Sequence, residues 1–226
     1  MDPQRILYED NHLIAVNKAA GELVQGDKSG DLPLCESIKA YLKEKYQKPG
    51  NVFCGVIHRI DRPVSGVVLF ARTSKALARM NEAVKERSFS KQYLAIVQNR
   101  PEHTGATLVH YLRKEEAQNK TYVSETEREG YRRAELAYRL IGQSERYYLL
   151  EIDLKTGRHH QIRAQLAAIG CPIKGDLKYG ASRSNPDGSI CLHARRICFT
   201  HPVSGATIQI TAPPPAAPLW QGFAPL

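Results

Sequence analysis

Residues 58–66 read His-Arg-Ile-Asp-Arg-Pro-Val-Ser-Gly, and the chain continues as Gly-Val-Val-Leu-Phe-Ala over 66–71. The run at 66–71 is apolar and continuous, which indicates a buried central strand. Pro63 and Gly66 indicate a shaped loop before that strand, and loops at strand ends often carry functional side chains. The sequence therefore predicts a loop that presents Asp61 just before a buried strand.

The surroundings of Asp61 favour an ionised carboxylate. Arg59 and Arg62 lie on either side of it in the chain, and nearby positive charge stabilises the charged form. An ionised and positioned carboxylate can serve as a nucleophile or a general base. The alternative is an aspartate that caps a turn among surface arginines, and these residues alone leave both interpretations open.

The elements around this loop indicate an α+β fold. Residues 106–154 alternate like antiparallel sheet, with Leu136, Tyr138 and Leu140 on one face. We expect one domain over 1–226, built on a mixed, mostly antiparallel central sheet flanked by helices and loops. The further strands are expected at 6–10, 12–17, 93–97, 191–199 and 206–212, the helices at 34–46, 73–87 and 160–169, a loop at 26–33, and a Pro-rich tail at about 213–226.

Composition narrows the class of protein. Of 226 residues, 42% are hydrophobic and 24% charged, which excludes a largely disordered or collagen-like chain. There is no run of 18 apolar residues and no secretion signal at the start, so we expect no membrane segment and a cytoplasmic location. Five cysteines without a Cys-x-x-Cys pair indicate reduced thiols.

The positive charge is concentrated in one stretch. The net charge is +9, and residues 155–196 contribute +6 of it, with eight basic and two acidic side chains. A phosphate-binding face has this character, because each neutralised phosphate releases counterions. A solvated surface with clustered charge is the other interpretation.

Residues 155–166 form a second candidate site. They read Lys-Thr-Gly-Arg-His-His-Gln-Ile-Arg-Ala-Gln-Leu, between a well-patterned strand and the start of a helix. Backbone N–H groups and cationic side chains meet there at a helix N-terminus, which favours an anion. A strand-to-helix connection with solvated arginines remains possible.

Taken together, these motifs resemble the RluA-type RNA pseudouridine synthases. The nucleophile motif of that family, His-Arg-Leu-Asp-x-x-Thr-Ser-Gly, appears at 58–66, its Lys-x-Tyr motif at 91–93, and its Thr-Gly-Arg-x-His-Gln-Ile-Arg motif at 156–163. The pattern continues in order through 172–180, 192–194 and 201–205. The resemblance covers about Ile6 to Ala212 and implies the pseudouridine synthase fold.

The resemblance implies roles for individual residues. Asp61 would attack the target uridine, so that its base detaches, rotates and rejoins through C5. Tyr93 would stack on the flipped uracil and take part in proton removal, and Arg163 would pair with the Asp61 carboxylate. Arg59 would fill the gap left in the RNA. The remaining RNA-binding candidates are Arg62, Arg158, His160, Lys174 and Lys178.

Two positions depart from the family pattern. Ile60 replaces the commoner Leu, and Val64 replaces the commoner Thr and lacks its hydroxyl. Neither change touches the nucleophile. The pattern begins at about Ile6, so we expect a single catalytic domain without a preceding RNA-binding domain of the S4 type. The segment Asp61-Arg62-Pro63 is similar to the members that modify transfer RNA.

The expected activity is therefore an isomerase that converts specific uridines of structured RNA, transfer or ribosomal, to pseudouridine by base flipping. We expect a monomer without cofactor or metal, whose partner is RNA. One alternative is a catalytically silent RNA-binding protein on the same fold. A remote alternative is a zinc hydrolase that uses His159, His160, Cys191 and His193.

Overall fold

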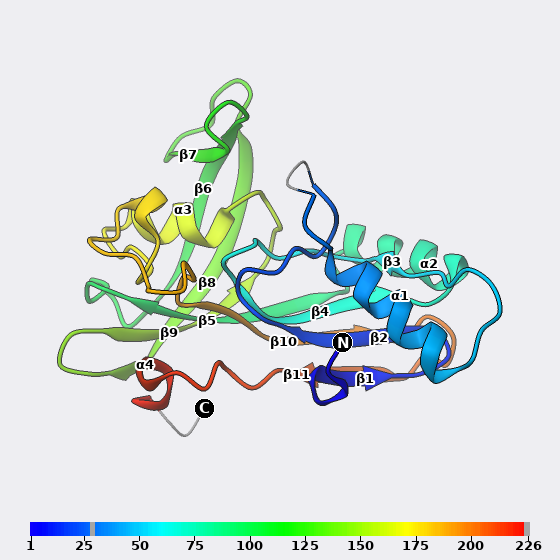
Figure 1. The fold of residues 1–226 in the computed structure, drawn as a ribbon. Coiled ribbons are helices and arrows are strands. Elements are labelled where there is room, and N and C mark those ends of the chain that lie inside the picture. The colour runs from blue at the N-terminus through cyan, green and yellow to red at the C-terminus, as the bar shows by residue number, and fades with distance from the viewer. Residues whose placement is uncertain (28–29, 224–226) are drawn as a thin grey trace. The chain divides into compact units, whose positions relative to one another are not determined.

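The computed structural model describes residues 1–27 and 30–223, and its contacts divide the chain into two compact units (Figure 1). The first unit comprises residues 1–89 and 194–214, and the second comprises residues 90–193 and the C-terminal residues from 215 onward. Asp61 belongs to the first unit, whereas Tyr93 and Arg163 belong to the second.

The sheet of the first unit is built around a strand that is buried along its whole length. This strand, β4 (Ser65–Ala71), pairs antiparallel with β2 (Leu13–Lys18), which pairs antiparallel with β1 (Ile6–Glu9). The short β3 (Gly55–Val56) also pairs with β4, and on the other side β4 neighbours β10 (Leu192–Thr200), which pairs with β11 (Thr207–Thr211). The predicted central strand is thus confirmed.

The described residues of the first unit include three helical segments: η1 (Pro3–Arg5), α1 (Leu34–Lys45) and α2 (Ser74–Lys85). Helix α1 buries Leu34, Ile38 and Leu42 on one stripe, as an amphipathic helix does on a sheet. Helix α2 begins where predicted, because the Thr73 hydroxyl accepts the Ala76 N–H at 3.2 Å.

Gly66 permits the close approach of two strands at the start of β4. Its φ is +119°, and a Cβ there would lie 2.3 Å from the Ala194 carbonyl oxygen of β10. Only glycine fits both the backbone conformation and the space. These constraints explain why glycine ends the segment 58–66.

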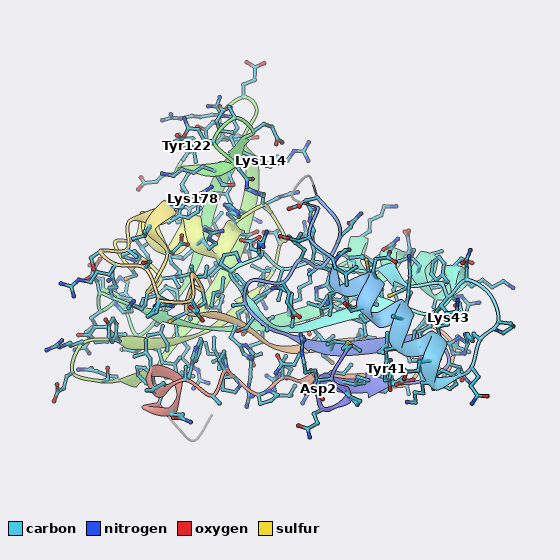
Figure 2. The ribbon with its side chains drawn as sticks, viewed as in Figure 1. Asp2, Tyr41, Lys43, Lys114, Tyr122 and Lys178 are labelled. Atoms are coloured by element: carbon cyan, nitrogen blue, oxygen red, sulfur yellow. The ribbon has the colours of Figure 1, made fainter. Side chains whose placement is uncertain are left out.

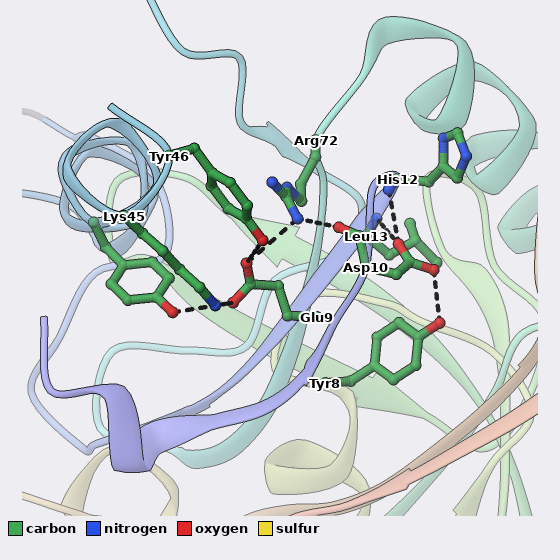
Figure 3. A network of polar contacts seen from close by, with 9 residues as sticks. Tyr8, Glu9, Asp10, His12, Leu13, Lys45, Tyr46 and Arg72 are labelled. Carbon is green, nitrogen blue, oxygen red and sulfur yellow. Dashed lines mark hydrogen bonds and ion pairs between the residues drawn. The ribbon is translucent and has the colours of Figure 1, made fainter. Parts of the chain in front are cut away.

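A polar network around Glu9 fixes α1 against the end of β1 (Figure 3). The Glu9 carboxylate, 10% exposed, accepts bonds from Lys45 Nζ at 2.9 Å, Tyr46 Oη at 2.7 Å and Tyr41 Oη at 3.1 Å. Burial raises the pKa of Glu9, but these hydrogen bonds outweigh it, so the pKa lies below its ordinary value of 4.5. The ionised carboxylate is therefore the form that the fold stabilises.

We expect Glu9→Gln to lower the free energy of unfolding by about 1–2 kcal/mol at pH 7, because charge-assisted bonds at a buried carboxylate are lost. A carboxyl group whose pKa is lower in the folded state stabilises the fold at pH values above its pKa in the unfolded state. This stabilisation is lost as the pH falls through its pKa in the folded state. The difference between the two proteins should therefore be constant above about pH 4.5 and shrink below it.

Urea unfolding at several pH values measures this difference. The matched control is Glu36→Gln on α1, which removes an exposed ion pair with Lys39. Its free energy of unfolding should change by less than about 0.5 kcal/mol. Equal effects of the two variants, or a Glu9→Gln effect unchanged well below pH 4, would contradict a structural role for the Glu9 charge.

The second unit holds an antiparallel sheet. Its strands are β5 (Ser90–Val97), β6 (Gly105–Glu115), β7 (Lys120–Ser124), β8 (Arg132–Gln143) and β9 (Tyr148–Leu154), in the spatial order β5-β9-β8-β6-β7. Leu136 and Tyr138 of the predicted face are buried and Leu140 is half-buried, while Leu150 and Ile152 of β9 are buried as well. Figure 1 shows these strands in green to yellow-green.

The helices of the second unit are α3 (Gln161–Ala168), the single turn η2 (Leu177–Tyr179) and α4 (Pro218–Gln221). Helix α3 contacts β6 and β7 and ends before Gly170, which has a φ of +73°. Within the Pro-rich tail, Trp220 is 5% exposed and meets the His193 ring edge-on. This part of the tail is therefore packed.

The α+β fold with a mostly antiparallel sheet is confirmed. The helix expected to reach residue 87 ends at Lys85, since Arg87 takes a φ of +61°. Part of the loop predicted at 26–33 and the last three residues of the tail lie outside the described residues. Among the described residues, no helix is long and apolar enough to cross a bilayer. The single domain over 1–226 stays a prediction.

Candidate active site

Asp61 lies in the loop that connects β3 to β4 in the first unit. Its side chain is half-buried, and its backbone carbonyl accepts the Val64 N–H at 3.0 Å, which closes a turn through Arg62 and Pro63. The residues on either side of the turn, Ile60 and Val64, are buried. The turn therefore has apolar anchors at both ends and presents the carboxylate between them.

His58 fixes the beginning of this loop. The imidazole is 7% exposed, its Nε2 accepts the backbone N–H of Leu69 in β4 at 3.1 Å, and its ring lies 5.2 Å from that of Phe89. An accepting Nε2 carries no proton, so this contact requires the neutral imidazole with its proton on Nδ1. His58 thus attaches the start of the loop to β4.

A second segment, residues 18–22, fixes the middle of the loop. The Arg62 carbonyl accepts the Gly21 N–H at 2.8 Å and the Lys18 ammonium at 3.1 Å. The Arg62 guanidinium donates to the Gly21 carbonyl at 2.9 Å and pairs with Asp31 at 2.7 Å. Arg62, predicted to bind RNA, therefore has internal partners for both its backbone and its side chain.

Lys18 was not found by the sequence reasoning. It ends β2 with only 1% of its surface exposed, although the sequence shows only a lysine after an apolar strand. Burial lowers its pKa to about 8, while the charges of Glu22 and Asp61 act in the opposite direction. The segment around Asp61 lies far along the chain, so the sequence gives no sign that Lys18 lies near it.

The second unit carries Tyr93 and Arg163. Tyr93 lies on β5 opposite Ile152 of β9 and is 6% exposed. Arg163 lies on α3, and its guanidinium forms a two-pronged ion pair with Asp176 at 2.7 and 2.9 Å. These side chains are 6% and 1% exposed, respectively. The predicted pairing of Arg163 with Asp61 joins residues of different units and stays a prediction.

Tyr179 also lies beside Arg163. The guanidinium carbon lies 5.0 Å from the centre of the Tyr179 ring, and the Tyr179 hydroxyl accepts the Thr121 N–H at 2.8 Å. The hydroxyl also bonds His160 Nδ1 at 2.9 Å. The sequence analysis included Asp176 and Tyr179 only within the family pattern at 172–180. In the structure both contact the Arg163 side chain.

His160 is poorly placed for the RNA contact that was predicted. It is 9% exposed, stacks on the His159 ring at 3.7 Å and takes a φ of +47°. Burial, followed by the charge of Arg163, moves its pKa far below the ordinary value of 6.5, so the ring is neutral. His160 therefore supports Tyr179 as an uncharged partner.

Most of the other basic candidates donate hydrogen bonds within the protein. Arg59 and Arg158 are exposed, and Arg158 donates to the Arg133 carbonyl at 3.2 Å. Lys174 donates to Asn185 Oδ1 at 2.7 Å, and Lys178 donates to the Gln118 and Asn119 carbonyls at the turn between β6 and β7. Figure 2 labels Lys178 together with Lys114 and Tyr122 of that hairpin. Their contact with RNA stays a prediction.

Polar groups at the start of α3, where the sequence indicated an anion site, already bond to one another. The Gln161 side chain accepts the Arg158 N–H at 3.0 Å and the Thr156 hydroxyl at 2.8 Å, and donates to the Glu135 carbonyl at 3.0 Å. The first N–H of the helix, that of Gln161, donates to the Arg158 carbonyl at 3.2 Å, so one of the N–H groups that would face an anion there is already bonded.

Across residues 1–27 and 30–223, no three side chains of the His, Cys, Asp or Glu type lie close enough to hold a metal ion. His159 and His160 stack on each other, while His193 packs on Trp220. The zinc hydrolase alternative therefore has no cluster of ligands to rest on in these residues.

Comparison with known proteins identifies the family. The family model described as RNA pseudouridylate synthase matches residues 12–168. The ribosomal large subunit pseudouridine synthase D of Xylella fastidiosa (strain Temecula1) is 34% identical over 94% of this chain and 66% of its own length. The ribosomal large subunit pseudouridine synthase C of Buchnera aphidicola subsp. Acyrthosiphon pisum is 32% identical over 92% of this chain and 67% of its own. The chain thus spans about two thirds of the length of these relatives.

The fold comparison agrees. The structure of human RNA pseudouridylate synthase domain containing 4 superposes with a TM-score of 0.78 at 21% identity, over 94% of this chain and 89% of that one. Human RNA pseudouridylate synthase domain containing 1 gives a TM-score of 0.72 at 20% identity, over 96% and 86%. With the family model covering more than half of its residues, the chain belongs to the RNA pseudouridylate synthase family.

Proposed function

We propose that the protein is an RNA pseudouridine synthase that uses Asp61 as its nucleophile. The observation that carries the proposal is the Asp61 loop. Its backbone is fixed through His58, Gly21 and Lys18, while the Asp61 side chain itself is only half-buried. A rigid loop that leaves a carboxylate accessible suits attack on a substrate, because a prepositioned nucleophile loses little freedom on reaction.

The reaction moves a base from one bond to another on the same sugar. Attack by the Asp61 carboxylate on C1′ of the ribose breaks the bond from C1′ to N1 of uracil. The uracil rotates, and C5 bonds to C1′ as the bond between C1′ and Asp61 breaks. C5 then loses its proton and N1 takes one up, which leaves Asp61 as a free carboxylate. A stacked uridine must first leave the RNA helix, which costs a few kcal/mol. Stacking on Tyr93 would return about 1–3 kcal/mol of that cost.

Ribosomal RNA of the large subunit is the substrate that we propose. Support comes from the names of the relatives, which are ribosomal large subunit pseudouridine synthases C and D. Transfer RNA, which the Asp61-Arg62-Pro63 segment favours by similarity, is the competing substrate. We further propose a monomer that works in the cytoplasm on these RNAs without a cofactor.

Tritium release from RNA labelled at C5 of uridine tests the function. The purified protein should release tritium from large-subunit ribosomal RNA transcripts and less from transfer RNA, because each pseudouridine formed expels one C5 hydrogen. Release from transfer RNA alone would show that transfer RNA, and not ribosomal RNA, is the substrate. RNA binding without release from any RNA would favour the catalytically silent RNA-binding protein.

A further inference from the structure

Two residues of one short turn in the second unit contact the Arg163 guanidinium. Asp176 precedes η2 and Tyr179 ends it, and the Tyr179 N–H donates to the Asp176 carbonyl at 3.1 Å. The Asp176 carboxylate accepts bonds from Nε and Nη2 of Arg163 at 2.7 and 2.9 Å. The guanidinium carbon lies over the Tyr179 ring, 5.0 Å from its centre. The turn therefore contacts both an edge and a face of the same guanidinium.

These two contacts restrain the Arg163 side chain in different directions. A two-pronged carboxylate fixes the guanidinium within its own plane. An aromatic ring over the face attracts the cation and opposes movement out of that plane. Tyr179 is 8% exposed and Asp176 is 2% exposed, so both restraints act away from bulk water, where charge interactions are stronger.

The Tyr179 ring is itself fixed through its hydroxyl. The hydroxyl accepts the Thr121 N–H at 2.8 Å and bonds His160 Nδ1 at 2.9 Å. Because the His160 ring is neutral, its Nδ1 can accept the one proton that the hydroxyl has to donate. Thr121 belongs to β7 and His160 directly precedes α3, so the hydroxyl connects η2 to both of these elements.

The hairpin of β6 and β7 is attached to η2 at a second residue as well. The ammonium of Lys178, which Figure 2 labels, donates to the Gln118 carbonyl at 3.2 Å and to the Asn119 carbonyl at 3.1 Å. The Lys120 ammonium lies 5.6 Å from the centre of the Tyr179 ring. The Tyr179 ring therefore has support from outside its own turn.

The Tyr179 hydroxyl does more than fill space. A phenylalanine would occupy nearly the same volume, whereas a buried hydroxyl costs free energy unless it is hydrogen-bonded. Burial raises the pKa of Tyr179, so the hydroxyl keeps its proton at neutral pH and can donate it to His160. The fold thus fixes this ring on two sides, and the cation over the ring is Arg163.

We propose that Tyr179 is a positioning residue for Arg163: its ring holds the guanidinium in one orientation, and its hydroxyl holds the ring. The inference rests on the proposed function and on the role that the family resemblance implies for Arg163 as the counter-ion of Asp61. Tyr179 acts on the reaction through Arg163.

The kinetic test measures kcat and KM for tritium release in two variants. Tyr179→Leu removes the ring, and we expect kcat to fall about 10–100-fold with KM changed less than about threefold, since a misdirected arginine loses rate rather than affinity. Tyr179→Phe keeps the ring but loses its hydrogen bonds, so kcat should fall by only about 3–10-fold.

Tyr138→Leu and Tyr138→Phe are the matched controls. Tyr138 lies on β8 of the same unit, is 6% exposed, and donates its hydroxyl proton to the His103 carbonyl at 3.2 Å. These variants remove the same atoms from a buried site without an arginine partner in the reaction. Their kcat should stay within about threefold of the wild-type value, because they affect stability and not the geometry at Arg163.

A comparison in a second background shows whether Tyr179 acts through Arg163. Arg163→Met/Asp176→Leu removes both the guanidinium and its carboxylate partner. In that background, Tyr179→Leu should change single-turnover tritium release by less than about twofold, because the group that it positions is gone. A further fall as large as that in the wild-type protein would mean that Tyr179 affects the reaction by another route.

The second test does not depend on activity. The NMR resonance of the Arg163 Nε–H, identified by its absence from Arg163→Met/Asp176→Leu, should be shifted to high field by the Tyr179 ring. Tyr179→Leu should abolish this shift, and Tyr179→Phe should keep it but speed exchange of the Nε–H with water. The Tyr138 variants should do neither. Failure of all RNA turnover with these shifts present would contradict the proposed function and not the positioning of Arg163.

The opposite results overturn the inference. An Arg163 resonance that Tyr179→Leu does not move, or a kcat for Tyr179→Leu no lower than that for Tyr138→Leu, would reduce Tyr179 to a structural residue. Should Tyr179→Leu fail to fold, Tyr179→Phe decides the question through the same comparison with Tyr138→Phe.

Discussion

Replacement of Asp61 by asparagine should reduce pseudouridine formation at least about 10³-fold, because an uncharged amide cannot form the bond to the sugar that releases the base. Asparagine matches aspartate in shape, so the turn closed by the Val64 N–H to the Asp61 carbonyl should persist. RNA affinity should stay within about threefold, since the binding face loses one negative charge and no donor.

Tritium release measures the first effect, and a filter-binding titration at fixed salt measures the second. Asp31→Asn is the matched control, because Asp31 is a carboxylate that pairs with the Arg62 guanidinium of the same loop and is 54% exposed. This control should keep its activity within about threefold. Activity in Asp61→Asn above that of Asp31→Asn would remove Asp61 from the mechanism.

Replacement of Arg163 should have the second-largest effect, on both activity and stability. Arg163→Met leaves the Asp176 carboxylate, 1% exposed, without its two-pronged partner, which costs about 3–5 kcal/mol of stability. We also expect turnover to fall at least about 100-fold, because the resemblance assigns the Asp61 counter-ion to this side chain.

A double variant separates these two effects. Arg163→Met/Asp176→Leu replaces the buried pair by apolar side chains, and such replacements often restore stability. It should recover most of the free energy of unfolding in urea while remaining as inactive as Arg163→Met. Recovery of activity along with stability would mean that Arg163 acts only through the fold. Arg139→Met, which removes an exposed pair with Glu151, controls for loss of an arginine in the same unit.

Much of the fold could be predicted because it depends on local patterns. The apolar run at 66–71 is a strand buried at every residue, and the alternating residues of the second unit form its antiparallel sheet. The Thr73 cap places the start of α2 within one residue. Such features repeat along a few neighbouring residues, so a single sequence reveals them.

The site was less predictable, because its supporting residues depend on partners far away in the chain. Lys18 lies 44 positions from the carbonyl of Arg62 to which it donates, and Asp176 lies 13 positions after Arg163. A lysine or aspartate is ordinarily exposed, so composition gave no reason to bury either. The acceptors of Lys174 and Lys178 are loop carbonyl and amide groups, which the sequence alone likewise does not reveal.

The most direct measurement maps pseudouridines in the ribosomal RNA of the host after deletion of the gene. The expected result is the loss of one or more large-subunit pseudouridines, which return when the wild-type gene is supplied and do not return with the Asp61→Asn gene. An unchanged map in the deletion strain, or full restoration by the Asp61→Asn gene, would contradict the account of this protein as an Asp61-dependent pseudouridine synthase of ribosomal RNA.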